Sequence, residues 1–433
     1  MTEELITNLS RIKELRVIAR TSVMKYKNSN STIAEISTEL DVPYILEGSV
    51  RKVDEMVRIT IQLIDAESEE NHWTQMYDRK LNDILGIQNN IAQQVAQTLQ
   101  MNLLSAEENQ FKKRVTESVE AYDFYLRGRE ELRNYNESSM RKALDYFDQA
   151  IQIDPEFAEA YAGLGDCYYF LSNVYLPPDE AMPRALSLAQ KALHINEFIA
   201  EAHATTAVVK AFYRWEWESA EEGFKRAIEL KPSYNTARQY YGLFLIAWGR
   251  LEEAMFQLNQ AYKLDPLSLS AEMTAVLPYY FGGQIEMTIE KTKRLIKSNP
   301  HFHPPYQVLG FSLMQIGEIS RGIEKIEKGQ DLSKNVNNLG YMGYAYAKAG
   351  LTDKAQGILK NLLSRDQRGE YIRPDQIALI YISLGEKDKA FEWLNKAIDK
   401  KVEELILLKV EPLFDSIRSD DRFQMLLQRM RLK

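Results

Sequence analysis

Three prolines, Pro232, Pro266 and Pro300, recur every 34 residues along the chain, and Ala220 and Ala254 keep the same interval. A fixed period of this length is typical of a helix–turn–helix unit that stacks on copies of itself. Because one such unit cannot bury its own apolar face, neighbouring units share a continuous core and leave a long concave surface. The period therefore predicts a helical solenoid over most of the chain, and it favours binding over catalysis.

The repeats are recognised by small residues, a large apolar residue and a closing proline. The cleanest copy has, in this order, Gly242, Ala254, Leu258, Ala261 and Pro266. Small residues are expected where the two helices of a hairpin cross closely. The proline is expected after the second helix, because it lacks the amide that would continue the hydrogen-bond ladder. Less regular copies of this pattern predict about eight repeats between residues 119 and 400.

Residues 1–104 do not share the period and have the pattern of a small α+β domain. Strict alternation of apolar and polar residues over 57–63 indicates a half-buried antiparallel strand, and residues 54–55 supply a turn before it. Thr32, or Ser31, is expected to cap a helix, with Glu35 three residues after Thr32. The expected strands are residues 15–19, 44–53, 57–63 and 71–77, and the expected helices are residues 32–40 and 84–103.

Two further segments flank the repeats. Residues 105–118 are charged and weakly periodic, and we expect them to be a connector. Residues 401–433 are amphipathic and break the repeat pattern. Since a solenoid needs a terminal element with a polar outer face, we expect capping helices there. The predicted fold class is mainly α: an α–α superhelix preceded by a small α+β domain.

Composition restricts the classes of function. The net charge of −8 argues against a chain-wide nucleic-acid surface, which needs clustered Lys and Arg. No stretch reaches the roughly 20 apolar residues of a membrane helix, and the N-terminus does not have the pattern of a secretory signal. A single cysteine, Cys167, excludes an intrachain disulfide and fits a reducing compartment. We therefore expect a cytoplasmic protein that binds neither nucleic acid nor membrane.

The repeat landmarks resemble the tetratricopeptide family. Residues 1–104 are similar to the TolB-like domain of bacterial and archaeal signalling proteins, through the segments ELRVIARTSV, LDVPYILEGSVRK, VRITIQLIDAES and HWTQMYDR. This resemblance implies a domain that commonly links an output module to a repeat array, the module being a nucleotide cyclase, a protein kinase or a winged-helix DNA-binding domain. It also implies a first strand ahead of residue 1. Without that strand, the sheet edge would be open to pairing with another chain, including a second copy.

No set of residues with catalytic spacing is evident. His301 and His303 could place two imidazoles on a metal, but two prolines follow and no HExxH or CxxC motif supports them, so a structural or exposed role is favoured. Cys167 is expected to be a buried free thiol. The glycines form no phosphate-binding loop. We predict no enzyme activity and no cofactor.

In the tetratricopeptide family, five positions of each first helix line the concave groove. Carried onto this sequence, they are Gln239, Leu243, Ile246, Met273, Leu277, Tyr280, Phe281, Gln307, Phe311, Met314, Asn337, Tyr344 and Lys348. Such an apolar, aromatic and methionine-rich set suits an amphipathic helix or an extended apolar peptide. The alternative is that several of these side chains pack against neighbouring first helices.

The sequence predicts a non-enzymatic interaction scaffold that binds a protein or peptide in signalling or regulation. The second hypothesis is the sensory or regulatory half of a multidomain cyclase, kinase or winged-helix regulator whose output domain lies outside this sequence. A third is an enzyme with an unrecognised site, which activity screening without an added partner would expose.

Overall fold

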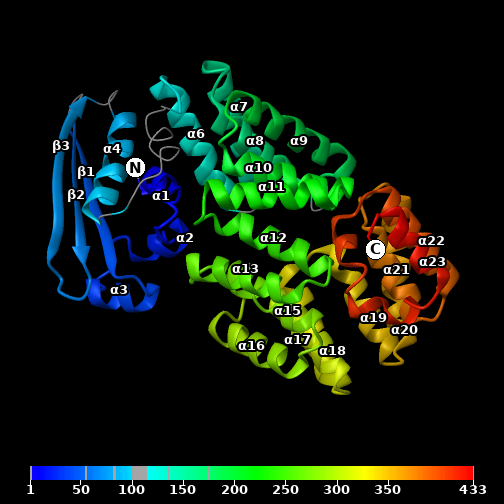
Figure 1. Ribbon diagram of the computed structural model, residues 1–433. Coiled ribbons are helices and arrows are strands. Elements are labelled where there is room, and N and C mark those ends of the chain that lie inside the picture. The colour runs from blue at the N-terminus through cyan, green and yellow to red at the C-terminus, as the bar shows by residue number, and fades with distance from the viewer. Residues whose placement is uncertain are drawn as a thin grey trace.

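The computed structural model describes residues 2–53, 56–80, 84–99, 101, 115–134, 136–172 and 175–432. An N-terminal unit with one sheet precedes a long array of helices, and the C-terminal residues lie beside the middle of that array (Figure 1). No helix in these residues is both long enough and apolar enough to cross a bilayer.

The N-terminal unit is an antiparallel sheet covered by helices on one face. The strands pair in the order β1-β2-β3, and Ile59 of β2 lies opposite Val50 and Tyr77. Ile59 and Ile61 are fully buried, as is Ile91 of α4, so the alternation read from the sequence marks the core side of the sheet. The elements are α1 (Thr2–Leu9), α2 (Arg20–Val23), η1 (Met24–Tyr26), α3 (Ile33–Leu40), β1 (Tyr44–Val53), β2 (Met56–Asp65), β3 (Asn71–Lys80) and α4 (Ile84–Thr98).

In the N-terminal unit the expected cap of α3 is present, whereas one expected strand is not. Helix α3 begins at the predicted capping box: Thr32 Oγ1 accepts from the Glu35 amide at 3.2 Å, and the Glu35 carboxylate accepts from the Thr32 amide. The strand expected at residues 15–19 is wrong, because none of the described strands pairs with them, and Leu15, Val17 and Ala19 bond to the solenoid instead. The turn at 54–55 and most of the connector at 105–118 lie outside the described residues.

Eight helical hairpins occupy the described residues from 119 to 399, which confirms the predicted α–α superhelix. They are α6 (Val119–Leu132) with α7 (Glu137–Ile153), α8 (Ala158–Leu171) with α9 (Pro178–Ile195), α10 (Ala200–Val209) and η3 (Lys210–Arg214) with α11 (Trp217–Leu230), α12 (Asn235–Ala247) with α13 (Leu251–Leu264), α14 (Leu269–Thr274) and α15 (Leu277–Phe281) with α16 (Ile285–Ser298), α17 (Pro304–Gln315) with α18 (Ile319–Ser333), η4 (Val336–Asn338) and α19 (Leu339–Lys348) with α20 (Thr352–Gln367), and α21 (Pro374–Ser383) with α22 (Lys387–Asp399).

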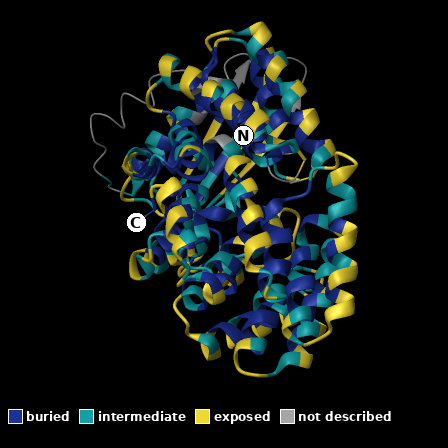
Figure 2. Cartoon of the chain, turned by 90° about the vertical axis from the view of Figure 1, so that its right-hand side faces the viewer, coloured by how far each residue is buried: buried dark blue, intermediate teal, exposed yellow. Residues whose placement is uncertain are grey.

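The sequence landmarks have the physical roles expected of them. Pro232, Pro266 and Pro300 each follow the last residue of a second helix by two positions. A Cβ atom added to Gly242 would lie 2.5 Å from Leu258 Cδ2, so a larger residue there would force the Leu258 side chain to shift. Buried residues concentrate on the inner sides of the helices and exposed residues on their outer sides (Figure 2).

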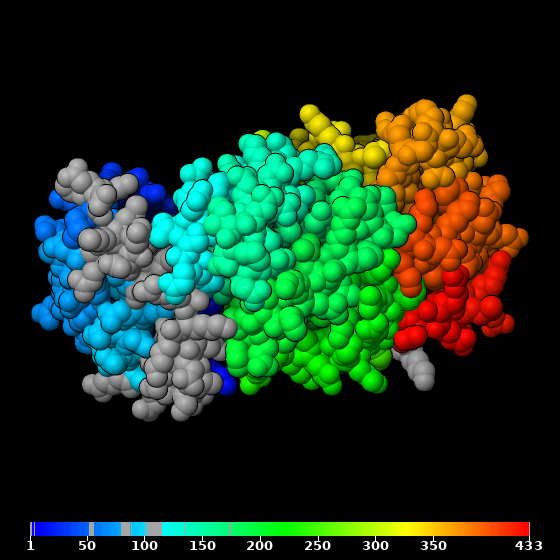
Figure 3. All heavy atoms as spheres, turned by 90° about the horizontal axis from the view of Figure 1, so that it is seen from above, coloured from blue at the N-terminus to red at the C-terminus, as the bar shows by residue number. Residues whose placement is uncertain are grey.

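The C-terminal segment, residues 402–432, does more than cover the eighth hairpin. It contains η5 (Glu403–Leu407), η6 (Pro412–Ile417) and α23 (Asp421–Arg429), and its apolar residues belong to the largest core cluster. The Trp217 indole N–H donates to the Met430 carbonyl at 2.9 Å, and the Tyr169 hydroxyl donates to Glu403 at 2.9 Å. In Figure 3 this segment, in red, lies against the green residues near position 220. The superhelix therefore closes on itself.

Candidate binding surfaces

The residues predicted to line the concave groove separate by burial. The half-buried members are Gln239, Leu243, Leu277, Phe281, Gln307 and Met314. The buried members are Ile246, Met273, Tyr280, Phe311, Asn337 and Tyr344, and Lys348 is exposed. Seven members of the predicted set thus keep some exposed surface, and six are enclosed in the core.

Four of the buried members, Tyr280, Phe311, Asn337 and Tyr344, contact either the C-terminal part of the chain or a neighbouring first helix. The Tyr280 hydroxyl donates to Glu411 Oε1 at 3.1 Å. Asn337 Oδ1 accepts from the Arg373 amide at 3.0 Å. Phe311 meets the ring of Tyr344 edge to face, with centroids 5.9 Å apart. Burial raises the pKa of the Glu411 carboxyl to about 7. Here the chain itself occupies the positions that an external peptide would contact.

A chain of charged residues crosses the inner side of the first three hairpins. Lys231 Nζ donates to Glu201 Oε1 at 2.8 Å, and the Thr205 hydroxyl donates to Asp166. Burial raises the pKa of Asp166 to about 7. Burial also acts to raise the pKa of Glu201, but the charges of Lys231 and Arg129 outweigh it and hold that pKa at about 2. Sequence reasoning missed this network, because its members come from separate hairpins and share no spacing.

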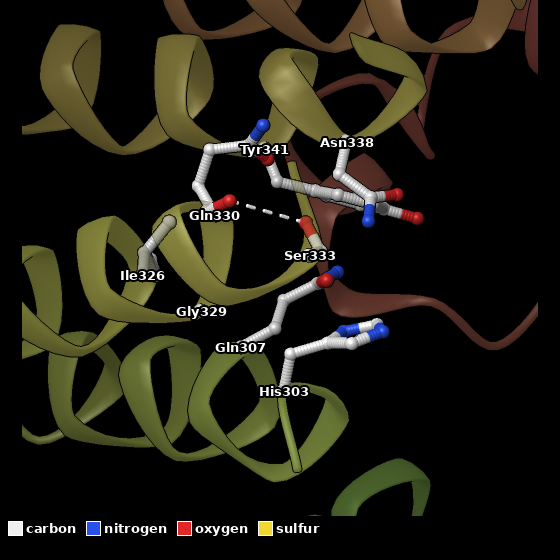
Figure 4. A pocket seen from close by; sticks show the side chains of 8 residues that line it. All are labelled: His303, Gln307, Ile326, Gly329, Gln330, Ser333, Asn338 and Tyr341. Atoms are coloured by element: carbon white, nitrogen blue, oxygen red, sulfur yellow. Dashed lines mark hydrogen bonds between the residues drawn. The ribbon is translucent and has the colours of Figure 1, made fainter. Parts of the chain in front are cut away.

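A small pocket lies between α17, α18 and α19, and Figure 4 shows its lining. His303, which precedes α17, and Gln307 of α17 face Gln330 and Ser333 of α18. The Ser333 hydroxyl donates to the backbone carbonyl of Gln330 at 3.3 Å. The volume of about 10 Å³ gives room for roughly one water. Burial lowers the pKa of His303. Among the described residues, no group of three or more His, Cys, Asp or Glu could hold a metal ion.

A much larger cleft, of about 1430 Å³, is lined by β1, α1, α2, α3 and α4 of the N-terminal unit and reaches α6 of the solenoid. Its lining includes residues 44–50 of β1, residues 14–18 and the face of α6. At the α6 end, the Glu3 carboxylate lies 3.6 Å from Arg20 Nε and 3.5 Å from an Arg129 guanidinium nitrogen. Burial acts to raise the pKa of Glu3, but Arg129 and Arg133 lower it overall. This ion cluster ties α1 to the first hairpin.

A family model matches two parts of the helical array. The family model described as "Tetratricopeptide repeat" matches residues 239–266, which span α12 and α13, and residues 375–399, which span α21 and α22. A solved tetratricopeptide repeat protein from Parabacteroides merdae has 13% identity and a TM-score of 0.40, covering 72% of this chain and all of that one.

Two curated relatives match over part of their length. A Rhizobium meliloti protein named as an adenylate cyclase is 34% identical over 216 residues, which is 49% of this chain and 37% of that protein. The transcriptional regulator HilA of Salmonella typhimurium is 27% identical over 275 residues, 62% of this chain and 48% of the regulator. The chain thus spans less than half the length of either relative. The family match and the hairpin geometry together show that the chain carries tetratricopeptide repeats within its helical solenoid.

Proposed function

We propose that the chain is a non-enzymatic interaction scaffold that binds a peptide or a helix along the inner surface of its solenoid, in signalling or regulation. The observation that carries this proposal is the row of half-buried residues on first helices: Gln239, Leu243, Leu277, Gln307 and Met314. Amides among aliphatic and thioether side chains suit a peptide, because the amides can bond its backbone while the other side chains adapt to its apolar residues.

The test places charge on that row. A partner captured from the source cell is identified, purified and titrated against the chain by calorimetry. Gln239→Arg combined with Gln307→Arg is expected to weaken binding at least tenfold, whereas Gln284→Arg, in the exposed turn before α16, changes it less than about twofold. Equal binding by both variants would refute the inner-surface site. Turnover of a substrate by the chain alone would refute the non-enzymatic assignment.

A second candidate is that the chain is the regulatory half of a larger protein. It is supported by the two partial matches, to a protein named as an adenylate cyclase and to one named as a transcriptional regulator. An upstream reading frame that encodes a cyclase, kinase or winged-helix domain, fused to this sequence in the transcript, would favour it. A transcript beginning at Met1 would exclude it.

For the organisation of the chain we propose a TolB-like domain at 1–104, a connector at 105–118, the repeats at 119–400 and capping elements at 401–433. The mixed helices and strands before residue 100 support the first assignment. We also propose that the protein acts in the cytoplasm on a protein or peptide ligand, and binds neither nucleic acid nor membrane.

A further inference from the structure

Residues 15–22, here called the strap, connect the N-terminal unit to the solenoid. They follow α1 and run into α2, which Figure 1 shows between the sheet and the ends of α12 and α13. The Val17 amide donates to Ser233 Oγ at 3.1 Å, and the Ala19 amide donates to the Leu264 carbonyl at 2.7 Å. Ser233 precedes α12 and Leu264 ends α13, so the strap is bonded to both ends of the fourth hairpin.

A buried aspartate joins the strap to two neighbouring hairpins. Asp265 is 2% exposed, and its Oδ1 atom accepts from the Ser22 hydroxyl at 2.6 Å, while its Oδ2 atom accepts from Asn235 Nδ2 at 3.1 Å. Ser22 Oγ accepts in turn from the Leu267 amide at 3.0 Å. A hydroxyl–carboxylate bond of this length is among the stronger hydrogen bonds in proteins. One buried cluster therefore links α2, the start of α12 and the turn that leads into α14.

Helices α12 and α14 are linked a second time at a residue of the proposed ligand row. Gln239 lies four residues after Asn235 and so on the same side of α12. Its Oε1 atom accepts from the Ser270 hydroxyl at 3.2 Å and from the Thr274 hydroxyl at 3.4 Å, and both residues belong to α14. Because a carbonyl oxygen has two lone pairs, these bonds use its whole capacity as an acceptor. A peptide N–H that donates to this atom must displace one of them.

The strap and a ligand on the inner surface therefore act on the same two helices in opposite directions. With the strap docked, Asp265 holds the start of α12 beside the turn before α14, which favours the bonds of Gln239 to α14. A peptide that takes the Gln239 carbonyl favours separation of the two helices. Two events that favour different states of one element weaken each other by the same factor.

We propose that residues 15–22 are an autoinhibitory strap through which the N-terminal unit controls the ligand site on the inner surface. With Ser22 bonded to Asp265, α12 and α14 stay together and the chain itself occupies Gln239. When the N-terminal unit withdraws Ser22, the helices separate and Gln239 accepts from a peptide backbone. The inference rests on the proposed function for its ligand, whereas the link between the strap and Gln239 is measured without one.

Amide hydrogen exchange in the full chain, with no peptide added, tests that link. The amides of Val17 and Ala19 bond to the solenoid, so their exchange reports release of the strap. Gln239→Ala removes both bonds to α14 and is expected to speed exchange at these amides at least about fivefold. Gln307→Ala, two hairpins further along, is expected to change it by less than about twofold. The amide of Ile91, in the core of the N-terminal unit, is expected to exchange equally slowly in both variants.

A matched pair of buried serines tests the direction of the control. Ser22→Ala removes the hydroxyl bonded to Asp265, and Ser312→Ala removes one bonded to the Val308 carbonyl of its own helix. Both serines are fully buried, so a general loss of stability affects the two variants alike. The probe is a fluorescent, end-blocked peptide of about ten residues of Leu, Val and Ser, which offers free backbone amides. Ser22→Ala is expected to bind it at least about fivefold more tightly than the wild type, and Ser312→Ala within about twofold.

Two results would overturn the proposal. One is exchange at Val17 and Ala19 that Gln239→Ala leaves unchanged. The other is binding of the probe by Ser22→Ala that is no tighter than binding by Ser312→Ala, which is the result of a purely structural bond. No binding of the probe by any form of the chain would contradict the proposed function instead, and the exchange experiment alone would then decide whether the strap controls Gln239.

Discussion

Gly128 and Gly163 enclose the ring of Phe147 between two neighbouring hairpins. A Cβ on Gly163 would lie 2.6 Å from Phe147 Cζ, and one on Gly128 would lie 2.7 Å from Cε1. The ring is fully buried, so it has no free space to move into. The spacing of small and large residues therefore predicts the hairpins well, because each landmark is one side of such a contact.

The same geometry makes a prediction about two glycines in helices. Gly163→Ala is expected to lower the free energy of unfolding by about 1–3 kcal/mol, because the new methyl overlaps the Phe147 ring. In Gly357→Ala the new methyl meets nothing within 4 Å. That variant is expected to raise stability by about 0.5–1 kcal/mol through helix propensity. Urea midpoints of the two variants measure this difference, and equal shifts would contradict the role given to Gly163.

A second prediction for single residues concerns pH. The pKa of Asp166 is about 7 in the folded chain against an ordinary 3.8, so the folded chain keeps a proton that the unfolded chain has released. The stabilising contribution of this group therefore falls as pH rises from about 4 to about 7. Glu411 acts in the same direction, while Glu201, held at about 2, titrates below this window.

Asp166→Asn removes that titration and keeps an oxygen that can accept from Thr205. The charged side chains of Arg129, Glu201 and Lys231 are unchanged in this variant, so the electrostatic surroundings of position 166 stay the same. We expect the urea midpoint of the wild type to fall more steeply between about pH 4 and pH 7 than that of the variant. Parallel profiles would show that Asp166 is ionised throughout this range.

For whole elements, prediction from sequence succeeded where structure depends on neighbours along the chain. The capping box of α3 and the prolines after α11, α13 and α16 are local signals, and they mark helix ends correctly. Residues 15–19 have strand composition, but a strand needs a partner, and composition cannot say whether one is present. The sequence also could not predict where the C-terminal segment packs, because its position depends on the curvature of eight hairpins.

For the groove residues, too, the sequence does not show which distant segments pack against them. The family pattern names positions on first helices, yet it cannot tell which of them the C-terminal segment or a neighbouring helix covers. Tyr280 is only 4% exposed, while Gln307 on the next first helix is half-buried. The proposed site therefore uses the accessible members of the predicted set.

Tyr280→Ala is thus expected to act on stability. Loss of a buried aromatic ring costs about 3–5 kcal/mol, and Tyr280→Phe, which removes only the hydroxyl bonded to Glu411, costs about 1 kcal/mol. Gln307→Ala is expected to change stability by less than about 0.5 kcal/mol. Chemical denaturation of the three variants checks this order. A Tyr280→Ala protein as stable as the wild type would mean that the C-terminal segment does not cover this ring.

At the scale of the whole molecule, closure of the superhelix is the main departure from an open repeat array. Residues of the third and fourth hairpins, among them Trp217 and Phe244, share one core cluster with Leu405, Phe414 and Met430 of the C-terminal segment. The C-terminal segment thereby covers some of the predicted groove residues, such as Tyr280, and leaves others, such as Gln307, partly exposed.

The distance between the third hairpin and the C-terminal helix tests this closure most directly. Spin labels are placed on Glu218→Cys and Gln428→Cys, both exposed, while Cys167 is buried and burial raises its thiol pKa well above the ordinary value. Because the Trp217 indole bonds to the Met430 carbonyl, the closed superhelix predicts a narrow distance below about 25 Å, roughly two helix diameters. A C-terminal segment that only caps the eighth hairpin would lie five hairpins away, and a distance near or beyond roughly 50 Å would contradict closure.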